Sequence, residues 1–271
     1  MKTEESSPLL PSAQTKADVP ALQMEDVTLG SIQDPRRVVA EGINWTVAVG
    51  DYWVVAGGQG AGKTDLFMMA GGLMAPLSGR YRLFGEDMPI FEAARLKGRL
   101  RVGLVFDGGQ LLHRLTVREN VALPLCYHHH LTEAQAQPRV QAMLDWLDLG
   151  PWADNTPATM PRNWQKRAGL ARALILRPEA LLADNPLGGL DVLQRSWWLA
   201  IFEQLSKGHG VMEGRPVTLA VSAADLRPWR RHARLFAILK NQRLTVLGGW
   251  EQVEKAEADV LHGVLEERHL E

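Results

Sequence analysis

The sequence predicts an α/β fold whose mainly parallel sheet is interrupted by a helical insert. Short, continuous apolar runs end in glycine or polar residues at 52–58, 181–184 and 216–222, which is typical of strands buried on both faces. These runs alternate with longer stretches of helical spacing, which favours parallel strands joined by helices. The 271 residues are 46% hydrophobic and 23% charged, so the chain can bury a sizeable core.

The N-terminal part is predicted to be a tail followed by a β-rich segment. Residues 1–20 mix Ser, Pro, Thr and charged residues without apolar periodicity, so we expect a disordered tail there. Between residues 22 and 49, two β-type stretches flank the polar turn SIQDPRR. A helix is expected after the glycines at 57–62 and before the turn at 76–79. Short apolar runs predict further strands at 80–85, 101–106, 181–184 and 216–222.

Helices and a hairpin are predicted for the rest of the chain. Residues 115–176 are rich in Leu, Ala, Gln and Arg, with few β-branched residues, which favours helix. The stretch 234–247 looks like a β-hairpin, and 250–269 like a charged helix. A helix with Trp197 and Trp198 is apolar nearly all round, so we expect core burial, with contact to a membrane protein as the alternative. Its other apolar residues are Val192, Leu193, Leu199, Ile201, Phe202 and Leu205.

Charge and composition exclude several classes of protein. The formal net charge is -1, so no basic excess favours a nucleic-acid partner. The single Cys126 excludes an intramolecular disulfide and a multi-cysteine metal site. No apolar run reaches the about 18–20 residues that span a bilayer, and the N-terminus lacks the layout of a signal peptide. We therefore expect a cytoplasmic protein.

Two conspicuous clusters are expected to be solvated surface. Adjacent helical residues point in different directions, so the run His128, His129 and His130 cannot converge on one metal ion. A basic cluster beside Trp229 lacks interleaved aromatic residues elsewhere, which favours a solvated face. This cluster consists of Arg227, Arg230, Arg231 and Arg234.

The segment GGQGAGKT at 57–64 satisfies the phosphate-loop pattern G-x-x-x-x-G-K-[ST], with a predicted strand before it and a helix after it. Its glycines let backbone N–H groups converge on phosphates, and the helix N-terminus adds its positive dipole end. Lys63 is expected to bridge the β- and γ-phosphates, and the Thr64 hydroxyl to ligate Mg²⁺. The predicted nucleotide-binding residues are Gly57, Gly58, Gln59, Gly60, Ala61, Gly62, Lys63, Thr64 and Asp65.

Asp65 has two interpretations. Its carboxylate would repel the α-phosphate unless a cation screens it. Alternatively, it stabilises the first turn of the helix through the dipole.

The segments after the phosphate loop resemble those of the ATP-binding-cassette (ABC) ATPases, over about residues 22–248. VGLVFDGGQLLHRLTVRENVALPL at 102–125 is similar to the Q-loop region of that family. MPRNWQKRAGLARALILRPEALLADNP at 160–186 is similar to its signature motif, signature helix and Walker B strand. PLGGLD at 186–191 resembles the D-loop, and VTLAVSAADL at 217–226 the switch strand.

The resemblance implies a RecA-like P-loop NTPase core with an antiparallel β portion and a helical subdomain at about 90–160. The cassette would span residues 21–250, between the tail at 1–20 and a C-terminal helix at 251–271. Two cassettes of this family sandwich two ATP molecules, each site using the phosphate loop of one chain and the signature of the other. The implied partners are a second ABC cassette, identical or different, and integral membrane permease subunits.

Membrane attachment and cargo follow from the same resemblance. The cassette would lie on the inner face of the cytoplasmic membrane and dock through residues 107–125. Leu111, Leu112, Leu115 and Val117 are expected to supply apolar contact there. The Q-loop stretch and KRAGLARAL look most like lipid-handling Mla/Mce transporters, and LADNPLGGLD is similar to lipoprotein-release ATPases. Lipid or lipoprotein is therefore the expected cargo.

Three positions around the catalytic centre of the family depart from its pattern. Asp184 matches the Walker B position and is implied, with Thr64, to hold Mg²⁺. Asn185 follows it, where the family has a Glu, and an amide cannot accept a proton from water. Ala223 replaces the switch His, and Asp107 replaces the Q-loop Gln.

The signature and the base-stacking position also depart. The signature reads Pro161-Arg162-Asn163-Trp164. Pro161 replaces a Ser whose hydroxyl meets the opposite γ-phosphate, and it lacks a backbone N–H. Arg162 and Asn163 replace glycines that permit close backbone approach. The aromatic residue that stacks on adenine in this family aligns with Ser31.

These departures beside an intact phosphate loop predict ATP binding with impaired or absent hydrolysis. Two alternatives stay open. One is an active ATPase in which Asp107 supplies the acidic group and Arg162 contacts a phosphate bidentately. The other is a structural subunit that does not depend on nucleotide.

Overall fold

The computed structural model describes residues 19–34, 36–88 and 96–256. The tail expected at 1–20 lies outside the described residues except for its last two positions. Most of the expected C-terminal helix also lies outside them, and its described part is α7 (Trp250–Lys255).

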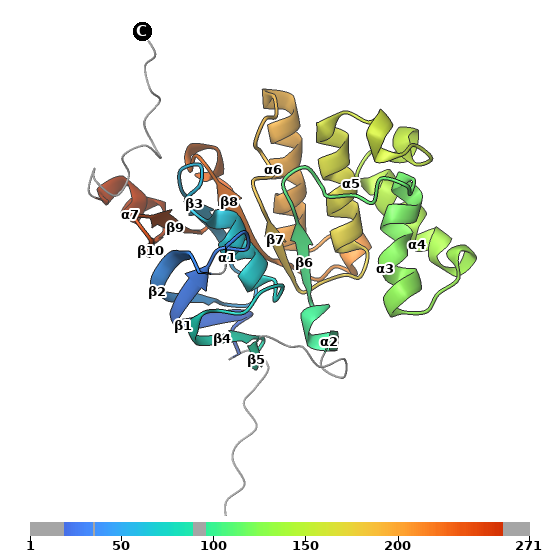
Figure 1. Ribbon diagram of the computed structural model, residues 1–271. Coiled ribbons are helices and arrows are strands. Elements are labelled where there is room, and N and C mark those ends of the chain that lie inside the picture. The colour runs from blue at the N-terminus through green and yellow to red at the C-terminus, as the bar shows by residue number, and fades with distance from the viewer. Residues whose placement is uncertain (1–18, 35, 89–95, 257–271) are drawn as a thin grey trace, which may run out of the picture.

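A six-stranded sheet forms the centre of the molecule, in the order β10-β9-β3-β8-β7-β6 (Figure 1). Its strands are β3 (Tyr52–Ala56), β6 (Val102–Val105), β7 (Ala180–Ala183), β8 (Thr218–Ala223), β9 (Leu235–Lys240) and β10 (Arg243–Gly248). Neighbours from β9 to β6 are parallel, whereas β10 pairs antiparallel with β9 in the predicted hairpin. Every residue of β3, β7 and β8 is buried, as their continuous apolar runs require. The predicted parallel sheet is thus confirmed.

A second, antiparallel sheet has the order β2-β1-β4-β5. Its strands are β1 (Leu22–Gly30), β2 (Val38–Val47), β4 (Ser78–Leu83) and β5 (Glu86–Met88). Helix α1 (Lys63–Ala70) contributes Leu66 and Phe67 to the hydrophobic core that this sheet shares with the central one. Trp45 of β2 and Trp53 of β3 meet edge to face there, with ring centroids 5.9 Å apart. This is the antiparallel portion that the family resemblance implied.

Three longer helices gather beside the β6 edge of the central sheet (Figure 1). They are α3 (Val117–His128), α4 (Glu133–Trp146) and α5 (Arg162–Leu174), and a short helix α2 (Leu96–Arg99) precedes β6. Thr116 and Thr132 start α3 and α4 with capping boxes, in which the Thr side chain accepts the backbone N–H of the residue three positions later, and that residue's side chain accepts the Thr N–H. The helix-rich character predicted for 115–176 is confirmed by these elements.

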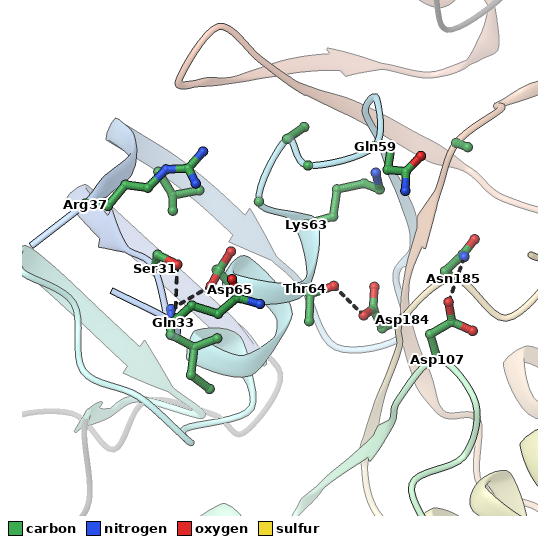
Figure 2. Close-up of a pocket in the computed structure, with 16 residues that line it drawn as sticks. Ser31, Gln33, Arg37, Gln59, Lys63, Thr64, Asp65, Asp107, Asp184 and Asn185 are labelled. Carbon is green, nitrogen blue, oxygen red and sulfur yellow. Dashed lines mark hydrogen bonds between the residues drawn. The ribbon is translucent and has the colours of Figure 1, made fainter. Parts of the chain in front are cut away.

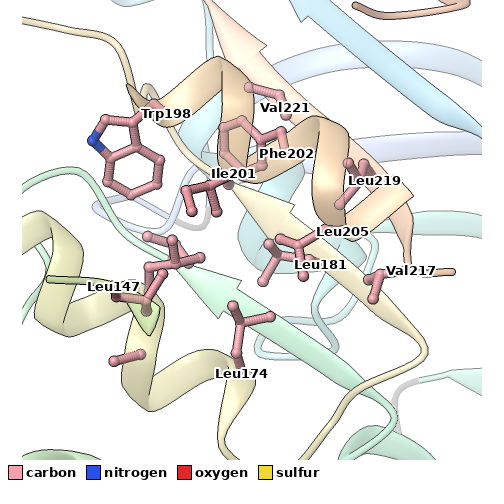
Figure 3. Packing of buried hydrophobic residues seen from close by; sticks show 14 of the residues in the cluster. Leu147, Leu174, Leu181, Trp198, Ile201, Phe202, Leu205, Val217, Leu219 and Val221 are labelled. Atoms are coloured by element: carbon pink, nitrogen blue, oxygen red, sulfur yellow. The ribbon is translucent and has the colours of Figure 1, made fainter. Parts of the chain in front are cut away.

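Helix α6 (Val192–Lys207) covers the central sheet with its C-terminal half (Figure 3). Trp198, Phe202 and Leu205 are almost fully buried, and they share a hydrophobic cluster with Leu181 of β7 and Leu219 of β8. The burial predicted for this half of the helix is confirmed.

The N-terminal half of α6 does not follow that prediction. Val192 is 77% exposed and Leu193 is 83% exposed, so the expected core burial is wrong for both. They belong to the first turn after the N-cap Asp191. No residue from 191 to 196 is buried, so this end of the helix extends beyond the packed core.

The docking surface expected at 107–125 is partly inside the protein. Leu111 is 6% exposed and Val117 is fully buried, whereas Leu112 is 48% exposed. Val117 is the first residue of α3, and it packs with Leu111 in the main core. Both therefore stabilise the fold and cannot supply surface contact. Among the described residues, no helix is long and apolar enough to cross a bilayer.

Candidate nucleotide site

The phosphate loop connects the end of β3 to the start of α1 and needs glycine at several positions. Gly60 and Gly62 have φ values of 77° and 93°, a region that other residues rarely adopt. A Cβ at Gly57 would lie 2.5 Å from the carbonyl oxygen of Leu239, and one at Gly62 would lie 1.9 Å from Val39. The loop is therefore compact, and the N-terminus of α1 opens onto it, as anion binding requires.

Lys63 folds back over the loop. Its Nζ donates to the carbonyl oxygens of Gly57, at 2.6 Å, and Gly58, at 2.8 Å. Burial lowers the pKa of the Lys63 ammonium, and the nearby Asp184 carboxylate opposes this shift. The ammonium is thus held at the rim of the loop, where a phosphate can replace the carbonyl oxygens (Figure 2).

The carboxylate of Asp184 accepts two short hydrogen bonds beside the loop. Thr64 Oγ1 donates to Oδ2 at 2.7 Å, and Ser222 Oγ donates to Oδ1 at 2.6 Å. Asp184 directly follows β7, and Ser222 lies near the end of the neighbouring β8, so parallel pairing brings them together. A hydroxyl oxygen and a carboxylate oxygen are ligands that Mg²⁺ prefers, so Thr64 and Asp184 fit a magnesium site.

Asn185 turns its amide toward Asp107. Its φ of 46° is left-handed, and its Nδ2 donates to Asp107 Oδ2 at 3.1 Å (Figure 2). The other oxygen of Asp107, Oδ1, lies 2.8 Å from Nζ of Lys166. Both carboxylate oxygens of Asp107 are therefore engaged by donors.

Asp65 has a role that neither sequence interpretation included. Its Oδ1 accepts the backbone N–H of Ile32 at 2.7 Å. The segment it holds, residues 31–34, begins at Ser31, whose N–H donates to the Arg37 carbonyl at 3.0 Å. Asp65 thus fixes this segment beside the phosphate loop.

These residues surround one cavity of about 640 Å³, which we call the nucleotide cavity. Its lining includes residues 59–65 of the phosphate loop, with Asp107, Asp184 and Asn185. Its other end is lined by Ser31, Ile32, Gln33, Arg37 and Val39. Gly57 and Gly58 do not line it. Ala223 is 6% exposed and does not line it either, whereas its neighbour Ala224 does.

The signature residues lie elsewhere. Pro161 is the N-cap of α5, and Arg162 and Asn163 line a second cavity of about 570 Å³ together with Asp107 and Asn185. Trp164 packs against the guanidinium of Arg167 and the ring of Trp152. Within one chain, the signature therefore contributes nothing to the nucleotide cavity.

Sequence reasoning missed two polar residues of the site. Ser222 is fully buried and also accepts the backbone N–H of Asn185 at 2.9 Å. Its signal was a hydroxyl side chain at the end of an apolar run. Lys166 is 4% exposed. The sequence signal for its burial was its spacing, because Gly169 and Leu170, three and four residues later, lie on the same, buried face of α5.

Comparison with known proteins agrees with this arrangement. Residues 40–188 match the family described as ABC transporter. The macrolide export ATP-binding/permease protein MacB of Syntrophobacter fumaroxidans is 35% identical over 198 residues, which are 70% of this chain and 27% of that protein. The chain thus spans about a quarter of that relative.

Two further comparisons cover most of the matched protein. The lipoprotein-releasing system ATP-binding protein LolD 1 of Rhodopseudomonas palustris is 32% identical over 175 residues, which are 64% of this chain and 77% of that protein. A solved dimer of the ATP-binding cassette MJ0796, in a post-hydrolysis state with ADP and Pi, superposes with a TM-score of 0.73. It covers 84% of this chain and 99% of that chain at 23% identity, which shows a common fold.

Proposed function

Since this chain belongs to the ABC transporter family, as an ATP-binding domain, we propose that it binds ATP with Mg²⁺ and hydrolyses it slowly or not at all. It acts as the nucleotide-binding subunit of a membrane transporter. The backbone N–H groups of the phosphate loop, Lys63 and the dipole of α1 bind the phosphates. Thr64 and Asp184 would hold Mg²⁺, which would supply positive charge against the phosphate oxygens.

The observation that carries this proposal is the contrast between two sides of one cavity. On the binding side, Lys63, Thr64 and Asp184 stand together with the geometry given above. On the hydrolytic side, Asn185 presents an amide that already donates to Asp107. An amide cannot act as a general base, so the cavity favours binding over turnover.

An active ATPase that uses Asp107 is the first alternative. A general base must reach the proton that it removes. One oxygen of Asp107 already accepts a hydrogen bond from Asn185, and the other is paired with the ammonium of Lys166. This arrangement favours a structural role for Asp107 in the lining of the binding site over a role as general base. The structural subunit without nucleotide remains an outcome of the titration below.

The proposed partners are integral membrane permeases and a second cassette. Exposed apolar side chains in and after the Q-loop support docking to a membrane subunit: Leu112 is 48% exposed, Leu123 37% and Tyr127 69%. The exposed Arg162 supports a role of the signature toward a second cassette, where it could contact a phosphate. With these partners, the proposed location is the inner face of the cytoplasmic membrane.

Lipid or lipoprotein transport is the proposed process. Support comes from the 32% identity to the lipoprotein-releasing protein LolD 1, which this chain covers over 77% of its length. The MacB relative is named for macrolide export. Export of a lipophilic or amphipathic cargo agrees with both relatives.

Calorimetric titration of the full chain with Mg-ATP tests the binding claim. The wild-type chain should bind ATP, and Lys63→Ala should weaken binding at least about tenfold, or 1.4 kcal/mol, because it removes the cation at the loop. Lys207→Met is the control, since Lys207 is exposed and pairs with Glu203 on α6. Absence of any heat of binding to the wild-type chain would favour the structural subunit.

A further inference from the structure

Lys166 is a buried cation whose ammonium is surrounded by three oxygen atoms. Its side chain is 4% exposed, and Nζ lies 2.8 Å from Asp107 Oδ1. The same Nζ donates to the carbonyl oxygens of Asn185, at 3.0 Å, and Gly188, at 2.8 Å. An ammonium has three donors, and a buried charge is tolerated where it is paired and hydrogen-bonded. Asp107 supplies the opposite charge, and two carbonyl oxygens of the loop 185–188 accept the hydrogen bonds.

All three of these residues line the second cavity, and two of them also line the nucleotide cavity. Asp107 and Asn185 line the nucleotide cavity and the second cavity alike. Gly188 lies in the loop that leads to α6, and it lines the second cavity. Lys166 itself stands on α5, four residues after Arg162. One cation therefore joins the signature helix to the wall of the nucleotide cavity.

The loop that carries Asp107 is held tightly against α5. A Cβ at Gly109 would lie 2.2 Å from the carbonyl oxygen of Gln165, and one at Gly169 would lie 2.6 Å from Cα of Gly109. Nη2 of Arg172 donates to the carbonyl oxygen of Gly109 at 3.0 Å. Asp107 therefore has little freedom to move away from Lys166, and its charge stays beside the cavity.

We infer that Lys166 is a positioning residue of the nucleotide site, which neutralises Asp107 and fixes Asn185 so that the cavity accepts a triphosphate. The inference rests on the proposed ATP binding. Without Lys166, the Asp107 carboxylate, whose side chain is 45% exposed, would face the phosphates as an uncompensated like charge, and like charges repel. The effect should be larger for ATP than for ADP, because the triphosphate carries more negative charge.

The experiment is calorimetry of the full chain with Mg-ATP and Mg-ADP. Lys166→Met keeps the length of the side chain and removes the charge. It should weaken ATP binding at least about tenfold, with a smaller effect on ADP. Asp107→Asn in the same chain removes the uncompensated charge and should bring ATP affinity back to within about threefold of wild type. Lys207→Met, at an exposed lysine of α6, should bind as wild type does.

Recovery by the second substitution separates positioning from a merely structural role. If Lys166→Met binds ATP as wild type does, or if Asp107→Asn fails to restore a weakened Lys166→Met chain, the inference is wrong. Should Lys166→Met not fold, as judged by its thermal unfolding, Asp107→Asn alone decides. That variant keeps the ammonium and should tighten ATP binding by about threefold or more, and weaker binding would overturn the inference. A wild-type chain that binds no ATP would overturn the proposed function, and the inference with it.

Discussion

Replacing Ser222 with Ala removes the hydroxyl that joins the end of β8 to the Walker B carboxylate. Ser222 is fully buried. Its Oγ donates to Asp184 at 2.6 Å and accepts the N–H of Asn185 at 2.9 Å. A hydrogen bond to a charged group contributes about 1.5–3 kcal/mol, and an orphaned buried N–H costs about 1–3 kcal/mol. The two terms overlap because they share one atom, so we expect a loss of about 3 kcal/mol in the free energy of unfolding.

Urea denaturation at pH 7 measures this loss, and thermal unfolding should show a midpoint lower by roughly 6–12 °C for a domain of this size. Ser206→Ala is the matched control, because the Ser206 hydroxyl is half-buried and donates to a helix carbonyl at 2.9 Å. It should cost under about 1 kcal/mol. A Ser222→Ala chain as stable as the control would refute the role given to this hydroxyl.

Two further substitutions test the surfaces around the site. Leu112→Asp should release the chain from its membrane complex and leave the isolated domain folded, as measured by co-purification, whereas Val246→Asp on β10 should not, although Val246 is similarly exposed at 46%. Equal co-purification of both variants would place docking elsewhere. Asp65→Ala removes the acceptor of the Ile32 N–H and should speed amide hydrogen exchange at Ile32 at least about tenfold, since an unprotected loop amide opens readily. Unchanged exchange would mean that Asp65 does not hold this segment.

The phosphate loop could be predicted from the sequence because its requirements are local. The glycine spacing, the preceding apolar strand and the following helix all lie within residues 52–70. Each of them can be recognised in the sequence. The buried strands were predictable for a similar reason. A continuous apolar run has few alternatives to a strand covered on both faces.

The polar contacts of the site could not be predicted in this way. Ser222 and Asp184 are 38 positions apart, and Asn185 and Asp107 are 78 apart. Their meeting depends on the order of the parallel strands, which the sequence alone did not specify. The burial of Lys166 was not predicted, because a charged side chain is usually exposed to solvent. The oxygen atoms around its ammonium come together only in the folded chain.

The exposure of four apolar residues differs from the sequence prediction, in two opposite directions. Val192 and Leu193 were expected in the core and are exposed, whereas Leu111 and Val117 were expected at a docking surface and are buried. The hydrophobicity of a side chain indicates only that its burial is favourable. It does not tell whether the same chain or a partner covers it.

Steady-state phosphate release by the purified transporter complex tests the central claim most directly. The wild-type complex is compared with one that carries Lys63→Ala, which removes the loop cation. Loss of a general base alone costs about 10²–10⁴ in rate, and the amide of Asn185 cannot act as that base. Phosphate release by the wild-type complex should therefore stay within about threefold of the Lys63→Ala background. Robust wild-type turnover that Lys63→Ala abolishes would contradict the account, and would show that Asp107 or another group performs the hydrolysis.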